Sequence, residues 1–539
     1  METKGKGAFV REATGLVREA SALDVFQFNG LSVTGVQMVP PWILLVPFIG
    51  APLGPLLLIA VTGAILIGAM YYILSVSMPR SGGDYVLGSR MLHPLAGIFT
   101  GTMTGILAGI VLVSWGATAW VPTGLSPLLA FLGALWNDKG LMDMASTVTQ
   151  PTFYGSLAVV ALIVFTLLLG LGGMRKYFVV QNVLVGISII AQLLIVGVLA
   201  STDHNTFVRE FNSFLQPFDM GYDQILSGAQ SSGWSAPAAV SLSLAFLAAP
   251  NLYGSMFWVQ ASSYLGGEIK HIRRSQLIGM VGCLLFWMAL AISTFLLMIN
   301  MVGYDFISAH DYLILKNPEA LGSLPPVPQY LIYVMVAARN PAIATFIALG
   351  LIAGTIPVVP WALILFSRSI FAMSFDRILP SFLSDISERF HTALKTLVLC
   401  SVVSFGFIAL AFLPQAAAFV TYFGVAQGFL YVITFVVIGF GAMLFPYLKK
   451  GLYETACPFK GRFLGIPIIS ILGALVLIFN IQDGYFLMSF PQYYGVTPEF
   501  LGTLVAAGIF ALVAYVVAKA YRKRQGIDIS LIFKELPPE

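Results

Sequence analysis

The chain is poor in charged residues. Lys and Arg number 28 and Asp and Glu number 24 in 539 residues, so charged residues make up only 10% of the sequence. Hydrophobic residues make up 58%, and the mean hydropathy is +0.89. A water-soluble globular protein needs a more polar surface than this composition supplies. We therefore exclude that class and predict a polytopic membrane protein, with room for about a dozen helices of roughly 20 residues each.

Cysteine and histidine are also scarce. The three cysteines, Cys283, Cys400 and Cys457, have neither paired nor metal-ligand spacing, and the five histidines fall at predicted helix ends or in loops. No Gly-x-Ser-x-Gly segment occurs, and the glycine runs at 81–83 and 172–173 lack the lysine pattern of a phosphate-binding loop. We therefore expect no metal site, no cofactor and no enzymatic activity.

The distribution of basic residues predicts the topology. Apolar runs between charged or Pro/Gly-rich breaks indicate twelve spans. If the N-terminus is cytoplasmic, all but four of the 28 Lys and Arg residues lie in cytoplasmic segments. We therefore predict that both termini are cytoplasmic, and that the net charge of +4 reflects this bias rather than nucleic-acid binding. The predicted spans are 25–47, 52–77, 95–120, 153–171, 178–200, 238–263, 277–300, 341–367, 394–413, 417–445, 466–482 and 499–519.

Four parts follow from these spans. The first 22 residues mix basic and acidic side chains without an apolar core, so they do not form a cleavable signal peptide. Two long outer segments, 201–237 and 301–340, are expected to carry short surface helices, including one at 328–338 that is either a connector or part of a lid. The parts are a cytoplasmic segment (1–22), a ten-helix transport core (23–447), helices 11 and 12 (448–520) and a cytoplasmic tail (521–539).

Small and polar residues interrupt two of the spans. The first span reads Phe-Asn-Gly-Leu-Ser-Val-Thr-Gly at 28–35, and the sixth reads Ala-Pro-Asn-Leu-Tyr-Gly at 249–254. A helix in lipid normally satisfies its own backbone groups, so an interrupted helix presents N–H and C=O groups to something polar. Glycine and serine also occur where membrane helices pack closely, which is the alternative interpretation. Two interruptions in the two halves of the chain favour an inverted-repeat transporter.

Such interrupted helices predict a site for a zwitterion. N–H groups at 33–35 would bind a carboxylate, and carbonyl groups near 29–31 and 249–253 would bind an ammonium group. Three aromatic side chains beside the second interruption would either cover the substrate or only pack. The predicted substrate-binding residues are Asn29, Gly30, Leu31, Ser32, Val33, Thr34, Gly35, Ala249, Pro250, Tyr253, Gly254, Phe257 and Trp258.

Four segments in order along the chain resemble a known family. Besides 28–35, these are Met-Pro-Arg-Ser-Gly-Gly-Asp-Tyr at 78–85, Gly-Gly-Glu-Ile-Lys at 266–270 and Ser-Arg-Ser-Ile-Phe-Ala-Met-Ser-Phe-Asp-Arg-Ile-Leu-Pro at 367–380. Together they resemble the amino acid–polyamine–organocation (APC) superfamily of permeases. The resemblance implies an all-α protein with twelve transmembrane helices, arranged as a leucine-transporter-like 5+5 inverted repeat with helices 1 and 6 broken.

The chain departs from the family pattern at both interruptions. The first span lacks the usual Ile-Gly-x-Gly-Ile-Phe ending, and Met-Phe-Trp-Val at 256–259 replaces the Gly-Phe-Glu or Gly-Trp-Glu of many members. Side-chain selectivity is therefore not transferred from the family. At the cytoplasmic side, charged residues of the family segments would form an ion-pair gate or simply be solvated. These are Arg80, Glu268, Lys270, Arg368 and Asp376.

The energy source stays open at this point. No Asp, Glu, Lys or Arg lies well inside the ten core spans, so no residue there marks a proton path. Sodium could bind between carbonyl groups of the first span and Gly354 and Thr355, although a threonine hydroxyl often only packs. A proton, a sodium ion, exchange and uniport are all compatible with the sequence.

These patterns predict a secondary active transporter for an amino acid or a related organic amine in the cytoplasmic membrane. It would work by alternating access, with the substrate and the lipid bilayer as its partners. The alternatives are a membrane binding protein without transport, a channel, and a permease for a polyamine or another organic cation. Since no acidic side chain is expected at membrane depth, neutral or small apolar amino acids are the preferred cargo.

Overall fold

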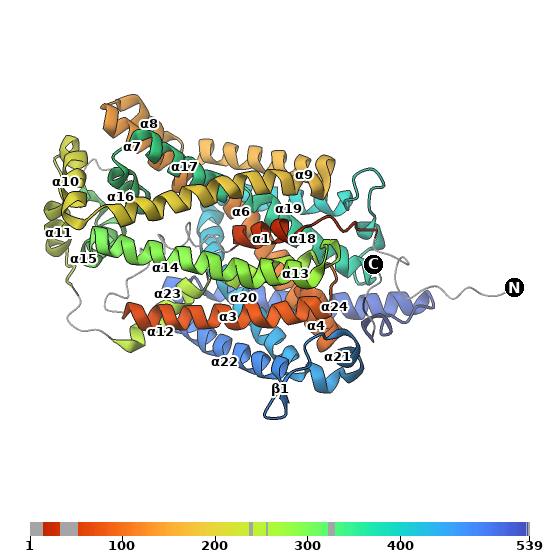
Figure 1. Cartoon of the computed structure of the whole chain (residues 1–539). Helices are drawn as coiled ribbons and strands as arrows, with labels where there is room; N and C mark the ends of the chain where they lie inside the picture. Colours follow the sequence, from red (N-terminus) through yellow and green to blue (C-terminus); the bar gives the residue numbers. More distant parts are fainter. Residues whose placement is uncertain are drawn as a thin grey trace.

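The protein is almost entirely helical. The computed structural model describes residues 15–32, 52–236, 241–254, 257–321, 329–534 and 536. Within these, the strands β1 (Arg462–Phe463) and β2 (Ile466–Pro467) pair as a small antiparallel hairpin. The long helices run roughly along one direction (Figure 1). Nine described helical stretches are long and apolar enough to cross a membrane, which confirms an all-α membrane protein.

The helices follow one another with short connections. The first half contains α1 (Ala22–Ser32), α3 (Leu53–Ser77), α4 (Asp84–Met91), α5 (Pro94–Thr100), α6 (Ala108–Trp120), α7 (Ser126–Trp136), α8 (Lys139–Thr147), α9 (Pro151–Ser201), α10 (His204–Leu215) and α11 (Tyr222–Ser231). The second half contains α12 (Leu242–Gly254), α13 (Ile272–Gln276), α14 (Cys283–Val302), α15 (Tyr304–Lys316), α16 (Gln329–Ala338), α17 (Pro341–Thr355), α18 (Val358–Phe375), α19 (Leu394–Ala411), α20 (Pro414–Leu448), α21 (Lys450–Ala456), α22 (Ile468–Ser489), α23 (Pro491–Tyr494) and α24 (Pro498–Arg524).

Four spans differ from their predicted form. Helix α9 covers both 153–171 and 178–200, and Gly173 breaks it with φ +69° and ψ −179°, a conformation that favours glycine. The third span does not stop at residue 120, because a π-helical turn, Val121–Leu125, leads directly into α7. The predicted span 341–367 is divided into α17 and α18. The short helices predicted in the two long segments are present as α10, α11, α15 and α16. The expectation that 328–338 lies on the surface is wrong, because residues 330–337 of α16 are buried.

The two predicted interruptions are seen in part. Helix α1 stays helical up to Ser32, and residues 33–35 lie outside the described residues. Helix α12 runs through Pro250 to Gly254, and a 3₁₀ helix, η4 (Phe257–Tyr264), begins three residues further on. The sixth span therefore changes from an α-helix to a 3₁₀ helix after Gly254, which is later in the sequence than Pro250.

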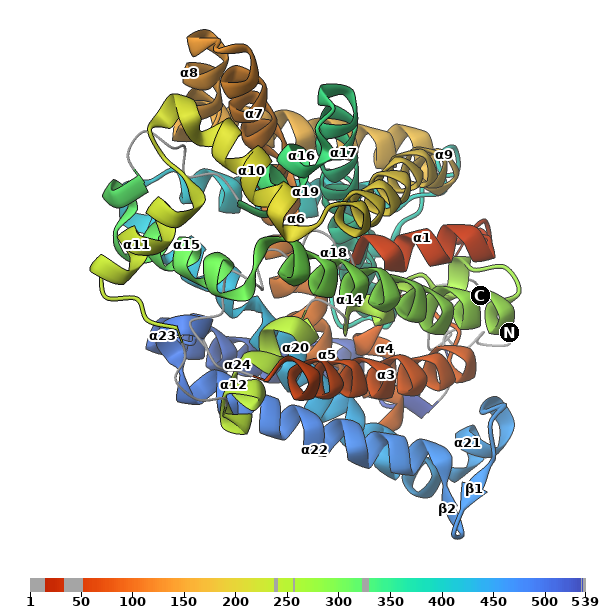
Figure 2. The same ribbon diagram turned by 60° about the vertical axis from the view of Figure 1, so that its left-hand side comes forward.

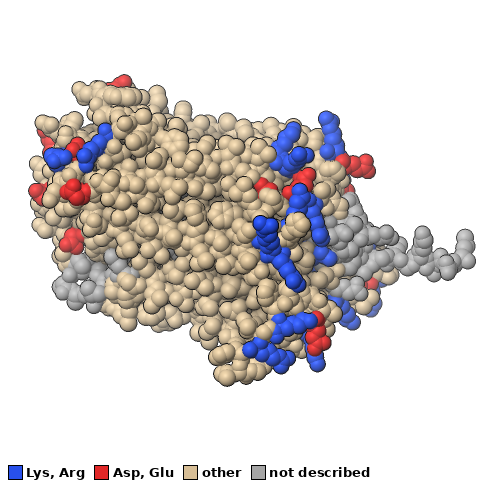
Figure 3. Space-filling view, in the orientation of Figure 1, with Lys and Arg blue, Asp and Glu red and all other residues tan. Residues whose placement is uncertain are grey.

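Charge is concentrated at one end of the molecule. On the face shown, Lys and Arg side chains gather near the end where the described part of the chain begins, and a band without charge separates them from a smaller charged group at the other end (Figures 1 and 3). We call the first end the basic end. Helices α10, α11, α15 and α16 lie at the opposite end (Figure 1). The uncharged band between the ends is the surface expected to face lipid.

Candidate functional site

The side chain of Asn29 joins the first predicted span to the sixth. Its Nδ2 donates hydrogen bonds to Ser262 Oγ and to the Gly279 carbonyl, both at 2.9 Å. The backbone N–H of Ser262 donates to Asn29 Oδ1, also at 2.9 Å. Ser262 lies on η4, so helix α1 and the second part of the sixth span are held side by side. Asn29 thus connects two helices with its side chain, a role that the sequence analysis did not predict.

Buried aromatic rings surround this junction. The Trp258 ring lies 4.1 Å from the Tyr431 ring and 5.7 Å from the Trp361 ring, between ring centroids. The Phe28 ring of α1 lies 6.1 Å from Trp361. Trp361 is on α18 and Tyr431 is on α20, so four elements contribute to one aromatic cluster. Sequence reasoning found only Trp258, because an aromatic residue in an apolar helix carries no signal of what it faces.

Tyr253 turns toward a different helix. Its hydroxyl donates to Asn480 Oδ1 of α22 at 3.0 Å, and its ring lies 5.0 Å from the Phe479 ring. These contacts place Tyr253 against α22, away from the role of a cover over the junction.

The remaining predicted substrate residues are placed in part. A Cβ atom added to Gly30 would lie 2.7 Å from Trp287 Nε1, so this glycine allows α1 to approach α14 closely. Ala249, Pro250 and Leu31 are buried. For the following predicted residues, the backbone or the side chain lies outside the described part of the structure: Ser32, Val33, Thr34, Gly35, Gly254 and Phe257.

Two buried ion pairs occupy the basic end. Arg368 binds Glu268 through two hydrogen bonds, Nε to Oε1 at 2.7 Å and Nη2 to Oε2 at 2.9 Å, and both side chains are 2% exposed. Arg90 binds Asp376 in the same two-fold manner, at 2.5 and 3.0 Å. The Tyr85 hydroxyl also donates to Asp376, at 2.7 Å. Paired and hydrogen-bonded charges of this kind tolerate burial.

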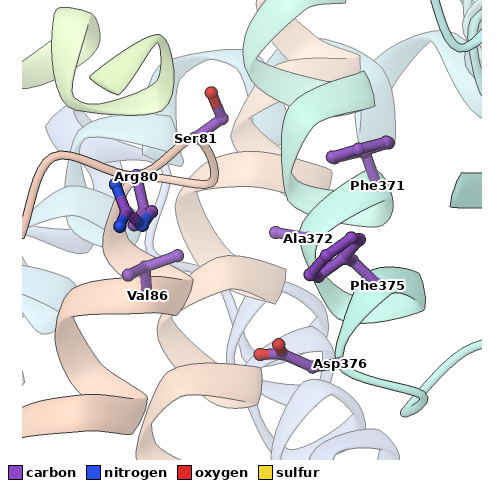
Figure 4. A pocket seen from close by; sticks show the side chains of 7 residues that line it. All are labelled: Arg80, Ser81, Val86, Phe371, Ala372, Phe375 and Asp376. Carbon is purple, nitrogen blue, oxygen red and sulfur yellow. The ribbon is translucent and has the colours of Figure 1, made fainter. Parts of the chain in front are cut away.

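The predicted ion-pair cluster is thus only partly assembled. Glu268 and Arg368 come together, but the partner of Asp376 is Arg90, which the sequence analysis did not select. Lys270 is exposed and forms no ion pair with a described residue. Arg80 and Asp376 line a cavity of about 10 Å³, shown in Figure 4. Such a cavity has room for about one water molecule, so no substrate passes there in this conformation.

Asp84 forms a third buried group beside these pairs. Its carboxylate accepts hydrogen bonds from the hydroxyls of Tyr71 at 2.5 Å, Thr104 at 2.7 Å and Tyr264 at 2.8 Å. Burial raises the pKa of Asp84, and the three hydrogen bonds lower it in part. The donors come from α3, the π-helical segment Gly101–Leu107 and η4, so no short sequence pattern could reveal this cluster.

The predicted cation residues lie at a helix end. Thr355 is the last residue of α17, and its buried hydroxyl donates to the Leu351 carbonyl at 2.8 Å. Gly354 is also buried. The hydroxyl bond lies within the helix and is typical of a packing threonine, so the structure adds no further observation in favour of sodium.

One premise of the sequence analysis is wrong. The predicted span 466–482 ends one residue before Asp483, and an acidic residue at membrane depth was not expected. Helix α22 continues to Ser489, so Asp483 lies inside an apolar helix, where it is only 5% exposed.

Comparison with known proteins gives one family. A sequence model described as amino acid permease matches residues 23–514. A search of curated proteins found no match. Among the described residues, no group of three or more His, Cys, Asp or Glu side chains is placed to hold a metal ion.

Proposed function

The chain belongs to the amino acid permease family, a family of transporters rather than enzymes, and from this we propose that it moves an amino acid or a related organic amine across the cytoplasmic membrane as a secondary transporter. The observation that carries the proposal is the Asn29–Ser262 link, because it joins the first predicted span to the sixth at one point inside the bundle. Helices interrupted at membrane depth beside each other are the substrate sites of inverted-repeat transporters.

The proposed topology has twelve spans and both termini in the cytoplasm. The gathering of Lys and Arg at the end where the described part of the chain begins supports this orientation (Figure 3). The basic end is then the cytoplasmic end. The Glu268–Arg368 and Arg90–Asp376 pairs act in this proposal as the inner gate, closed in the present conformation and opened when substrate leaves toward the cytoplasm.

The substrate binds beside the junction of α1 and η4. Its carboxylate takes N–H groups at 33–35, and its ammonium group takes carbonyl groups near 29–31 and 249–253. The side chain of the substrate lies against the aromatic cluster, which includes Phe28, Trp258 and Trp361. These rings are uncharged, so a neutral or small apolar amino acid fits better than a dibasic one. Arginine that competes with uptake as well as leucine or alanine would contradict this selectivity.

Counterflow in reconstituted vesicles tests the function. Vesicles loaded with unlabelled alanine or leucine should take up the labelled form in a saturable manner, which neither a channel nor a binding protein does. Gly35→Leu and Gly254→Leu should abolish uptake while the protein still inserts, because a bulky side chain would fill the site. Gly186→Leu is the matched control, since a Cβ at Gly186 would meet nothing within 4 Å. Normal uptake by both site variants would reject the proposed location.

A sodium ion bound between carbonyl groups of α1 and the Gly354–Thr355 end of α17 is one candidate for the ion that drives transport. Oxygen ligands suit this hard cation. Replacement of sodium by choline should then abolish concentrative uptake. Uptake that is unchanged without sodium would remove this candidate.

A further inference from the structure

Asp483 is an acidic residue inside an apolar helix. It lies six residues before the end of α22 (Ile468–Ser489), roughly 9 Å from that end along the helix axis. No other Asp, Glu, Lys or Arg occurs in this helix. An ionisable side chain inside a membrane helix is costly, and in transporters it commonly serves the transported ion or proton.

The surroundings of Asp483 do not compensate a negative charge. No hydrogen bond or ion pair joins its carboxylate to another described residue. Helix α22 packs against α3, α12 and α20, which lie beside it in Figure 2. These three helices contain no Asp, Glu, Lys, Arg or His. The titratable groups that face Asp483 are the hydroxyls of Tyr253 on α12 and Tyr494 on α23.

Those two tyrosines connect Asp483 to the interrupted sixth span. Tyr253 donates to Asn480, which lies one helical turn from Asp483 on α22. Tyr494 donates to the Leu247 carbonyl of α12. The two contacts hold α12 on both sides of Pro250, one before it and one after it. A change of charge at Asp483 therefore acts directly on the side chains that fix the position of α12.

We infer that Asp483 is the proton-binding site of this transporter, an assignment that rests on the proposed function. In the closed packing the carboxyl group is protonated, because a neutral acid costs little among apolar side chains. When α12 moves with its substrate, water reaches the carboxyl group and takes the proton. On the side where a proton is taken up, hydronium gives its proton to the Asp483 carboxylate, so an O–H bond of hydronium breaks as the carboxyl O–H bond forms. On the side of release, the carboxyl O–H bond breaks and water takes the proton to become hydronium. The substrate itself is not changed.

Proteoliposomes separate this inference from the proposed function. We would compare the wild type, Asp483→Asn, Asp483→Glu and the exposed control Asp223→Asn, with radiolabelled alanine and leucine as probes. Counterflow at equal pH on both sides reports substrate binding and exchange. Accumulation driven by an inward gradient of one pH unit, together with a pH dye, reports proton movement. For one proton per substrate, this gradient supports roughly a tenfold accumulation.

The expected result is a split between the two measurements. Asp483→Asn should keep counterflow but lose both the roughly tenfold accumulation and the proton signal, whereas Asp483→Glu and Asp223→Asn should keep all three. Difference infrared spectra on substrate addition should show a carboxylic acid band that is absent in Asp483→Asn and shifted in Asp483→Glu. If Asp483→Asn folds poorly, the infrared spectra of the wild type and Asp483→Glu still test the assignment.

Three outcomes would overturn the inference. In one, Asp483→Asn moves protons like the wild type. In another, it loses counterflow along with the proton signal, as expected if Asp483 bound the substrate ammonium instead. In the third, the wild type shows counterflow, but a pH gradient drives neither accumulation nor a proton signal. Absence of counterflow in the wild type would instead reject the proposed function, so the two failures are distinguishable.

Discussion

The two ends of the molecule treat buried charge in opposite ways. At the basic end, Glu268 is paired with Arg368 and Asp376 with Arg90, and each pair has two hydrogen bonds. At the opposite end, Asp311 of α15 is buried, and neither of its carboxylate oxygens has a partner among the described residues. The basic end therefore has paired charges, whereas the opposite end buries an acidic side chain without a partner among the described residues.

The residue beside Asp311 shows the same lack of partners. His310 Nδ1 lies 2.6 Å from the Tyr333 hydroxyl of α16, but its Nε2 has no partner among the described residues. Burial lowers the pKa of His310 to about 3 and raises the pKa of Asp311 well above its ordinary value. Both shifts favour the neutral form of the side chain.

The difference shows two ways of closing an end of the bundle. Paired charges hold the basic end closed by bonds that require both partners, so loss of either partner is costly. Neutral packing holds the opposite end, so this end responds to pH. A transporter that works by alternating access needs both ends to open, and the two kinds of contact predict different sensitivities for them.

The largest effect is expected at the Glu268–Arg368 pair. Arg368→Met leaves the Glu268 carboxylate buried and unpaired, which should lower the stability by about 3–5 kcal/mol. Thermal unfolding in detergent measures the loss. The double variant Glu268→Leu with Arg368→Met is the control, since it removes both charges and should recover much of the stability. A single variant as stable as the wild type would show that the pair does not hold the basic end.

Glycine packing should also differ between the ends. A Cβ at Gly97 would lie 2.4 Å from Ser89 Cβ and 2.5 Å from the Tyr85 carbonyl oxygen, so Gly97→Ala should destabilise the basic end by about 1–3 kcal/mol. At the opposite end, a Cβ at Gly228 would meet only Leu313 Cδ1, at 3.8 Å. Gly228→Ala should therefore be tolerated or slightly stabilising. Equal unfolding temperatures for the two variants would contradict the difference in packing.

Acid should act on the opposite end through His310. In the folded protein the pKa of His310 is about 3, below its ordinary value of 6.5. The stability that the neutral ring contributes is therefore fully present above pH 6.5 and is lost as the pH falls toward 3. Between pH 7 and pH 5.5 the loss should be about 1 kcal/mol. Asp311 acts in the opposite sense, because its raised pKa makes low pH favourable. His310→Gln isolates the histidine contribution: the variant should lose less stability than the wild type over this range. Parallel pH curves for the two proteins would rule out the role of His310.

The smallest effect is expected at an exposed pair of the basic end. Lys395 and Asp385 lie 2.9 Å apart, but their side chains are 58% and 42% exposed. Lys395→Met should change the unfolding free energy by less than about 1 kcal/mol, and less still in high salt. A loss comparable with that of Arg368→Met would mean that burial is not what distinguishes the paired charges.

Local sequence patterns predicted a large part of this protein. The membrane class, most spans, the short helices of the two long segments and the family follow from apolar runs and short motifs. The Glu268–Arg368 pair was also predicted, because both residues belong to motifs of the same family. Arg90 was missed, since it follows its own motif segment by five residues and nothing in the sequence indicates that α4 packs against the end of α18.

Longer-range features could not be predicted in the same way. The hydroxyl donors of Asp84 come from three separate elements, and Tyr253 faces α22 rather than the junction of α1 and η4. Asp483 was placed outside its span because the apolar run ends near it, whereas the helix continues for six more residues. Each of these features depends on which face of a helix packs against which neighbouring helix.

Hydropathy and motifs are local properties, so the chain alone was sufficient for the membrane class, the approximate spans and the permease family. Lipid requires every backbone group to be satisfied within a helix, which makes long apolar segments easy to recognise. The rotation of each helix about its axis is not encoded in this way, because nearly all faces of these helices are apolar. Only tertiary packing decided that Arg90 pairs with Asp376, that Asn29 joins α1 to η4, and that Asp483 lies on a helix packed against α12.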